Sequence, residues 1–179
     1  MIEVSIEHDH DAESPRQDSH LGTMVFFGRH SGYGDEHEFK TPEDFDHYCV
    51  AANVIRLPVY AYVHSGITIS TKRTGQYADR WDSGQLGYIY ATREQVRECY
   101  KAKRMGRRVT ERALKALQGE VQELDDYMVY GMYTVEVCED EELVDSIGSV
   151  PYELIKNGDV AEEFEEKYRE AIREECKKL

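Results

Sequence analysis

Histidine and acidic side chains in three separate segments are the groups of this chain whose types suit catalysis or metal binding. They are His30, Asp35, Glu36, His37, His64 and Asp82. A divalent ion needs three or more converging ligands, and imidazole and carboxylate groups can both serve. The chain has no HExxH motif and no paired cysteines, so we expect no bound metal and no cofactor. An alternative function, a small metal-assisted enzyme, would use Asp35, His37, His64 and Asp82 as its catalytic residues.

The sequence gives less support to a serine nucleophile or a phosphate-binding site than to the histidine and acidic residues named above. His64 precedes Ser65, and an imidazole beside a hydroxyl can activate it, but neighbouring residues at a strand end point to opposite sides. A GxSxG elbow, a GxxxxGK[ST] loop and a GxGxxG fingerprint are all absent. We therefore expect neither a serine hydrolase nor a nucleotide hydrolase.

The Trp81-Asp82-Ser83-Gly84 segment has the composition of a rigid turn. Asp and Ser side chains bond nearby backbone groups, Gly permits a positive φ, and Trp is costly to expose. We expect Trp81 to be mostly buried, where it would anchor the sheet to a helix, and Asp82 to accept backbone hydrogen bonds. Replacing Asp82 by Ala would then lower the stability by about 1–2 kcal/mol.

Local patterns predict the elements that must position these residues. Strand patterns lie at residues 2–6, 21–29, 57–91 and 127–139, and Gly131 is a candidate bulge in the last of them. Helix patterns begin after the N-cap candidates Thr41 and Thr92, and they cover residues 42–54, 93–105 and 109–118. A terminal helix would bury one face made of Val160, Phe164, Tyr168, Ala171, Ile172 and Leu179.

These elements predict an α+β fold, in which a mostly antiparallel sheet is covered by helices and a C-terminal amphipathic acidic helix follows. A length of 179 residues is typical of one domain with one core. We therefore expect a single domain over residues 1–179, with residues 151–179 as a C-terminal helical extension.

Cysteine spacing and hydropathy indicate the environment of the chain. Cys49, Cys99, Cys138 and Cys176 lie far apart in the sequence, which favours reduced, buried thiols over a disulfide framework. No long apolar run and no secretion signal are present. We expect a soluble protein in the cytoplasm of its producing cell, with no membrane contact.

The stretch from Leu57 to Ala91 contains the runs LPVYAYVHSGI and WDSGQLGYIY. It resembles a family of small, mostly uncharacterised proteins of tailed phages and mobile elements, in which an LPLYxYDHSGI-like run precedes a WDSGQxGxIY-like run. The likeness covers roughly residues 15–150. The family usually has Asp where Val63 stands, a Cys shortly before the WDSG run, where this chain has Arg80, and Cys-Trp at Ile147-Gly148. The resemblance implies an accessory protein of a phage or mobile element.

Charge is distributed unevenly along the chain, whose formal net charge is −14. Residues 93–118 contain nine basic and three acidic residues, whereas residues 119–179 contain 19 acidic and six basic ones. Such asymmetry favours electrostatic recognition of a partner. The candidate binding residues are Glu162, Glu163, Glu165 and Glu166 in the acidic segment and Arg97, Lys101, Arg104 and Arg108 in the basic segment.

Family context and charge together favour a protein that acts by binding. The expected partner is a host defence protein or a protein–nucleic-acid complex, such as a CRISPR effector or a restriction enzyme, which the chain would inhibit, for instance by acidic mimicry of nucleic acid. Direct binding to a duplex is not expected, because the chain is acidic as a whole. A virion or assembly component without catalysis is a further alternative, and the sequence leaves the oligomeric state open.

Overall fold

The computed structural model describes residues 1–179 and divides them into two compact units. Unit 1 consists of residues 1–14 and 126–179, and unit 2 consists of residues 15–125. Each unit combines helices with its own antiparallel sheet, which confirms the α+β class. The strand near the N-terminus pairs with a strand of residues 132–139, and together with residues 142–151 they form a sheet separate from that of unit 2.

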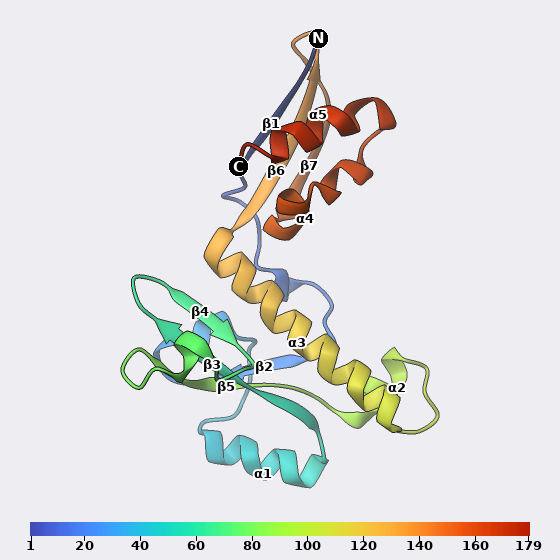
Figure 1. Ribbon diagram of the computed structural model, residues 1–179. Helices are drawn as coiled ribbons and strands as arrows, with labels where there is room; N and C mark the ends of the chain where they lie inside the picture. The colour runs from blue at the N-terminus through green and yellow to red at the C-terminus, as the bar shows by residue number, and fades with distance from the viewer. The chain divides into compact units, whose positions relative to one another are not determined.

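Unit 2 contains a four-stranded antiparallel sheet in the order β2-β5-β3-β4 (Figure 1). Its strands are β2 (Thr23–Phe26), β3 (Ile55–Val63), β4 (Ile67–Ser70) and β5 (Ser83–Ala91). Its helices are α1 (Pro42–Ala52), α2 (Arg93–Cys99) and the first part of α3 (Arg107–Tyr130), and short 3-10 turns are η1 (Pro15–Gln17), η2 (Gly28–Tyr33) and η3 (Gly75–Ala78).

Two helices cover the opposite faces of this sheet (Figure 1). Phe45 and Cys49 of α1 pack against Val25 with Tyr88 and Tyr90 of β5. The next residue of β5, Ile89, points to the other face because strand side chains alternate. There it meets Leu117 of α3 beside Gly22, where an added Cβ would lie 2.5 Å from Leu117. Gly22 therefore allows the chain to pass between the helix and the sheet.

Helix starts agree with the sequence analysis more closely than helix ends. Thr41 and Thr92 both form capping boxes, with Asp44 and Gln95 as their third-position partners. The helix that was predicted for residues 93–105 ends at Cys99, because Lys101 adopts a left-handed conformation with φ of 49°. The next helix, α3, is longer than predicted at both ends.

Gly131 ends a helix and is not a strand bulge, so that prediction was wrong. Helix α3 continues to Tyr130, and the Gly131 N–H bonds to the Tyr127 carbonyl at 2.9 Å. A φ of 72° at Gly131 then turns the chain into β6. This left-handed conformation is the one in which helices commonly end at a glycine.

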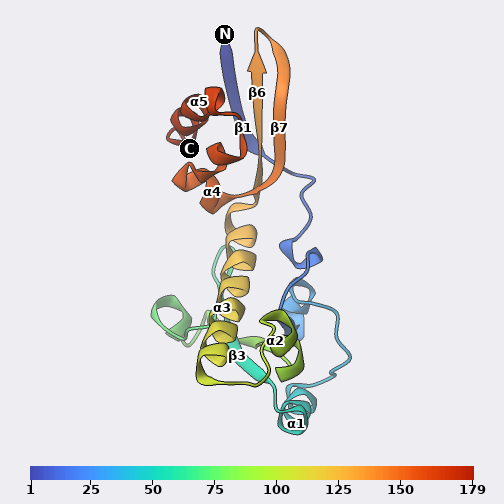
Figure 2. The same ribbon diagram turned by 90° about the vertical axis from the view of Figure 1, so that its right-hand side faces the viewer.

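Unit 1 contains a three-stranded antiparallel sheet in the order β1-β6-β7. Its strands are β1 (Ile2–His8), β6 (Met132–Glu139) and β7 (Glu142–Pro151). The chain then forms α4 (Tyr152–Asn157), a 3-10 turn η4 (Asp159–Glu163) and α5 (Glu166–Cys176). Figure 2 shows α4 and α5 on one side of this sheet, with no helix of unit 1 on the other.

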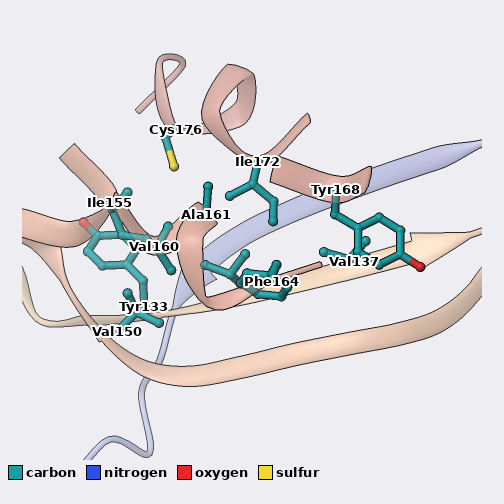
Figure 3. Packing of buried hydrophobic residues seen from close by; sticks show 11 residues of the cluster. Tyr133, Val137, Val150, Ile155, Val160, Ala161, Phe164, Tyr168, Ile172 and Cys176 are labelled. Carbon is teal, nitrogen blue, oxygen red and sulfur yellow. The ribbon is translucent and has the colours of Figure 1, made fainter. Parts of the chain in front are cut away.

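The core of unit 1 lies between this sheet and its helices. Figure 3 shows Tyr168 and Ile172 of α5 close to Phe164 and Val137. The predicted C-terminal acidic helix therefore exists with the expected buried face, although the chain is extended at Phe164 between η4 and α5. Leu179, which we expected in that face, is 64% exposed because α5 ends at Cys176.

The cysteines and the helices bear on two further expectations. All four thiols are free; Cys49 and Cys176 are buried, Cys138 is half-buried and Cys99 is exposed, so burial is confirmed for two of them. Burial raises the pKa of the Cys49 and Cys176 thiols. None of the helices combines the length and apolar character needed to cross a bilayer.

Candidate functional site

The turn before β5 holds its tryptophan in solvent. Trp81 is 93% exposed, so the prediction that it is buried was wrong. Oδ1 of Asp79 accepts the backbone N–H groups of Trp81 at 2.7 Å and of Asp82 at 2.9 Å, and these bonds lower the pKa of Asp79. The Ser83 hydroxyl donates to the Tyr77 carbonyl at 3.1 Å and also contacts the Asp79 carbonyl. The turn is fixed, and it holds the indole in solvent.

Asp82 contacts a histidine, and Asp79 takes the backbone role that we had assigned to Asp82. Oδ2 of Asp82 lies 3.2 Å from Nδ1 of His64. The pairing of β3 with β5 brings them together, because the Val63 N–H bonds to the Asp82 carbonyl at 2.8 Å. Both side chains are accessible, at 67% exposed for His64 and 43% for Asp82. A carboxylate in this position can orient an imidazole for proton transfer.

A cavity of about 440 Å³ opens beside this pair in unit 2. It is lined by apolar side chains of β3 and β5 and by polar groups from η2 and from the turn before β5. The lining residues are Phe27, Arg29, His30, Ala61, Val63, Trp81, Asp82, Ser83, Gly84, Gln85 and Leu86. Nε of Arg29 lies 3.3 Å from Nε2 of His30, so a cation and an imidazole share one wall. Sequence reasoning missed Arg29, since nothing in its neighbourhood marks a site.

Asp35 belongs to a buried ion network and is not placed with His64 and Asp82. Its carboxylate accepts two hydrogen bonds from Arg16, at 2.9 and 2.5 Å, and one from the Met24 N–H at 2.7 Å. Arg16, whose side chain is 7% exposed, also bonds Glu120 at 3.1 Å. Burial alone would lower the pKa of the Arg16 guanidinium, but the carboxylates of Asp35 and Glu120 raise it above its ordinary value. We assign Asp35 a structural role.

His37 is held among aromatic rings near Asp35. Its Nε2 lies 3.0 Å from the Phe26 carbonyl, while Nδ1 is buried without a hydrogen-bond partner. The ring lies beside Phe27 and Phe39. His37 and Asp35 line a second cavity, of about 480 Å³. The four residues of the enzyme alternative therefore fall into two pairs, and no three His, Cys, Asp or Glu side chains are arranged to hold a metal ion.

The basic segment forms two helices joined by a turn, and its residues do not share one continuous helical face. Arg97 lies on α2, Lys101 and Arg104 lie in the turn, and Arg108 lies at the start of α3. All four side chains are exposed. The guanidinium of Arg112 lies 4.3 Å from the centre of the Tyr100 ring. This contact ties the turn to α3, so the basic residues are presented on a fixed framework.

The acidic residues that we expected as an interface are partly neutralised. Glu162 pairs with Arg169 at 2.7 Å and also with Arg173. Glu165 lies 4.0 Å from Lys167, while Glu163 and Glu166 are exposed without an ion pair. Part of the charge on the helices of unit 1 is therefore compensated within the unit.

A second group of acidic side chains without an ion pair lies on the sheet of unit 1. Residues 1–14 and 126–155 together contain 13 acidic residues and no Lys or Arg, and two of the 13 are paired, Glu139 with Lys167 and Asp140 with the N-terminal amine. Val4 and Ile6 pack against the core, so Glu3 and Glu7 point to the face without helices. Glu136 pairs with Ser5 in the register and extends this row on β6. We call Glu3, Glu7 and Glu136 the open acidic face.

Comparisons of the chain with protein-family models, with curated proteins and with solved structures found no match.

Proposed function

We propose that this chain acts by binding, as a phage or mobile-element accessory protein that inhibits a host defence that targets nucleic acid. Its target would be a CRISPR effector or a restriction enzyme, alone or with its bound nucleic acid. The open acidic face would occupy a positively charged nucleic-acid-binding surface of that partner. One observation supports this proposal above others, and it is the separation of charge between the two units.

Charge separates along the same boundary as the fold. Unit 1 has 21 acidic and six basic residues, a formal charge of −15, whereas unit 2 has 15 acidic and 16 basic residues, a formal charge of +1. Solubility does not require this separation of charge, since positive and negative side chains are usually interspersed on a protein surface. A field of one sign over a whole unit speeds association with a partner of opposite sign and makes it depend on salt.

A sheet is a suitable support for carboxylates that imitate phosphates. Same-face side chains repeat about every 6.8 Å along a strand, and neighbouring strands lie about 4.8 Å apart. Glu3 and Glu7 are two such repeats apart, about 14 Å, and Glu136, opposite Ser5 on the neighbouring strand, lies about 8 Å from each of them. The register of β1 with β6 is unbroken from Ile2 to His8, so the row does not need to be ordered on binding. Binding then costs less conformational entropy.

The test is capture from a bacterial host lysate with the intact chain, followed by competition. We expect a nuclease or its guide complex to be recovered at low salt and released as salt is raised. The intact chain should then displace DNA from the recovered enzyme. Recovery of nothing reproducible at low salt, or of an enzyme whose DNA binding is unaffected, would contradict the proposal.

Matched variants locate the interface. A triple variant, Glu3→Gln, Glu7→Gln and Glu136→Gln, removes the open acidic face and is expected to weaken competition with DNA by tenfold or more, on the order of 1.4 kcal/mol. Its control, Glu163→Gln, Glu166→Gln and Glu170→Gln, removes three charges from the helices of the same unit. Equal losses from both variants would show that only the total charge matters, and that the sheet has no special role.

A second candidate function is a small enzyme centred on His64 and Asp82. The 3.2 Å contact between them beside a cavity favours it, because the carboxylate can orient His64 as a general base. Asp35 and His37 would take no part. The discriminating measurements are metal content and thermal shift with zinc, manganese or magnesium, together with hydrolase assays of His64→Gln. No metal effect and no activity that depends on His64 would remove this candidate.

A further inference from the structure

Trp81 is presented to solvent by a rigid turn, although indole is among the costliest groups to expose. Two backbone bonds to Asp79 and two contacts of the Ser83 hydroxyl fix the backbone on both sides of it. Its 93% exposure is therefore built into the turn and does not come from a loose chain end. An exposed aromatic ring on a fixed support is the form that stacking platforms take in proteins that bind unpaired bases.

The cavity next to Trp81 supplies the other contacts that such a ligand needs. Its volume of about 440 Å³ falls in the range of about 300–1,000 Å³ that is common for small-molecule sites. Ala61 and Val63 give it an apolar wall, and Arg29 with His30 gives it a cationic one. The carboxylate of Asp82 is already engaged by His64, so it opposes an anion less than a free carboxylate would.

We propose that this cavity binds a base of single-stranded nucleic acid, stacked on Trp81, with the adjoining phosphate held by Arg29. Arg80, which is exposed and precedes Trp81 in the sequence, is close enough along the chain to hold the next phosphate. Guanidinium groups pair well with phosphate oxygens. Bases inside a duplex are stacked on one another and present no free face to an indole, so a duplex does not fit the site. The site lies wholly in unit 2 and needs no partner protein, so it stands independently of the proposed inhibition.

The chain contains a single tryptophan, so its fluorescence reports directly on the site. The experiment titrates the intact chain with a 15-nucleotide oligo(dT), with oligo(rU) of the same length, and with a blunt DNA duplex, all at low salt. We expect quenching by at least one single strand and much less by the duplex. Quenching by both single strands indicates recognition of base and phosphate, and quenching by RNA alone adds the 2′-hydroxyl. No quenching by either strand, or equal quenching by the duplex, would overturn the proposal.

Variants tested with a labelled oligonucleotide locate the contacts. Trp81→Ala should weaken binding by about tenfold, within the range of roughly 5- to 160-fold that loss of one stacked base gives, and Trp81→Phe should weaken it by less. The control Val50→Ala truncates another exposed apolar side chain in unit 2 and should have no effect. Arg29→Gln should weaken binding and flatten its salt dependence, whereas Lys156→Gln, which removes a cation from unit 1, should not. Unchanged affinity in Trp81→Ala, with the variant folded by circular dichroism, would exclude this site.

Discussion

Asp79 shows how a single residue decides the conformation of a turn. Residues Trp81-Asp82-Ser83-Gly84 have the composition of a turn, yet the acceptor carboxylate lies two residues before Trp81. Asp commonly bonds the N–H two residues ahead of it. Applied to Asp79, this rule places residue 81 at the tip of the turn, where its side chain points to solvent. The composition of the segment predicted the turn, but it did not predict which carboxylate closes it.

Replacing Asp79 by Asn should lower the melting temperature of unit 2 more than replacing Asp82 by Asn, because the charged carboxylate of Asp79 binds two backbone N–H groups more strongly than the neutral amide oxygen of Asn does. Backbone hydrogen bonds depress the pKa of Asp79 in the folded state. Its contribution is therefore present above the unfolded pKa and is lost as the pH falls through the folded value. Thermal unfolding followed by circular dichroism should show the difference in melting temperature between the unsubstituted chain and Asp79→Asn at pH 7, and the difference should vanish at strongly acidic pH. A difference that persists there would contradict this assignment.

Arg16 and its partners Asp35 and Glu120 form an ion network in unit 2 whose side chains are largely shielded from solvent. Arg16→Met leaves two carboxylates without their cation, and removing one partner of a buried ion pair typically costs about 3–5 kcal/mol. The Arg16 side chain is 7% exposed and the Glu120 side chain is 11% exposed. We therefore expect the free energy of unfolding, measured in urea, to fall by an amount near this range. The control Arg107→Met breaks an exposed pair with Glu111, with Arg107 91% exposed, and should cost less than about 1 kcal/mol. Similar losses in both variants would show that Arg16 acts like a surface residue.

Some helix and strand boundaries of this fold are set by neighbouring residues in the sequence, and others are set by tertiary contacts. Thr41 and Thr92 carry their capping partners within three residues, so the sequence predicts both helix starts. The end of α2 at Cys99 depends on the left-handed conformation of Lys101. No glycine or proline stands at that position to predict it from the sequence. The row of apolar residues in 160–172 was found by its spacing, whereas the break at Phe164 was not, because both sides of the break pack into one core.

One glycine inside α3 and one just after it test the position of the helix end. Gly131 has a φ of 72°, and an added Cβ there would be strained whatever the space around it; Gly131→Ala should destabilise unit 1 by about 1 kcal/mol. Gly119 lies inside the same helix, and an added Cβ would meet nothing within 4 Å. Gly119→Ala should therefore stabilise the helix by about 0.5–1 kcal/mol. Chemical denaturation measures both, and effects of the same sign would contradict the helix boundary described here.

The candidate site illustrates what the sequence cannot reveal. His64 and Asp82 were named from residue type, and the pairing of β3 with β5 brings them into contact. Asp35 has the same chemistry, but Arg16 and Glu120, which are far from it in sequence, hold it in a structural role. Residue type predicts what a side chain can do. Its partners, which are set by tertiary contacts, decide whether it is available.

Charge separation predicts different salt responses for the two units. Like charges repel within unit 1, which has a formal charge of −15 by the counts above, so added salt should stabilise it by screening. Unit 2 is close to neutral and should respond less. Hydrogen exchange of β1 and β6 amides reports on unit 1, and exchange of β3 and β5 amides reports on unit 2. We expect protection in β1 and β6 to rise between about 20 mM and 500 mM salt, with a smaller change in the unfolding of unit 2; the reverse order would contradict this account.

The pairing of β1 with β6 also sets an order of events during synthesis. The partner of β1 emerges about 120 residues after it, which at roughly 5–20 residues per second corresponds to about 6–24 s. Unit 2 is complete in sequence before β6 exists, so it can fold while β1 waits as an unpaired strand at the ribosome. Charged and polar side chains on a free strand discourage aggregation with other nascent chains. The alternating residues Glu3, Ser5 and Glu7 would therefore also protect β1 before its partner strand is made.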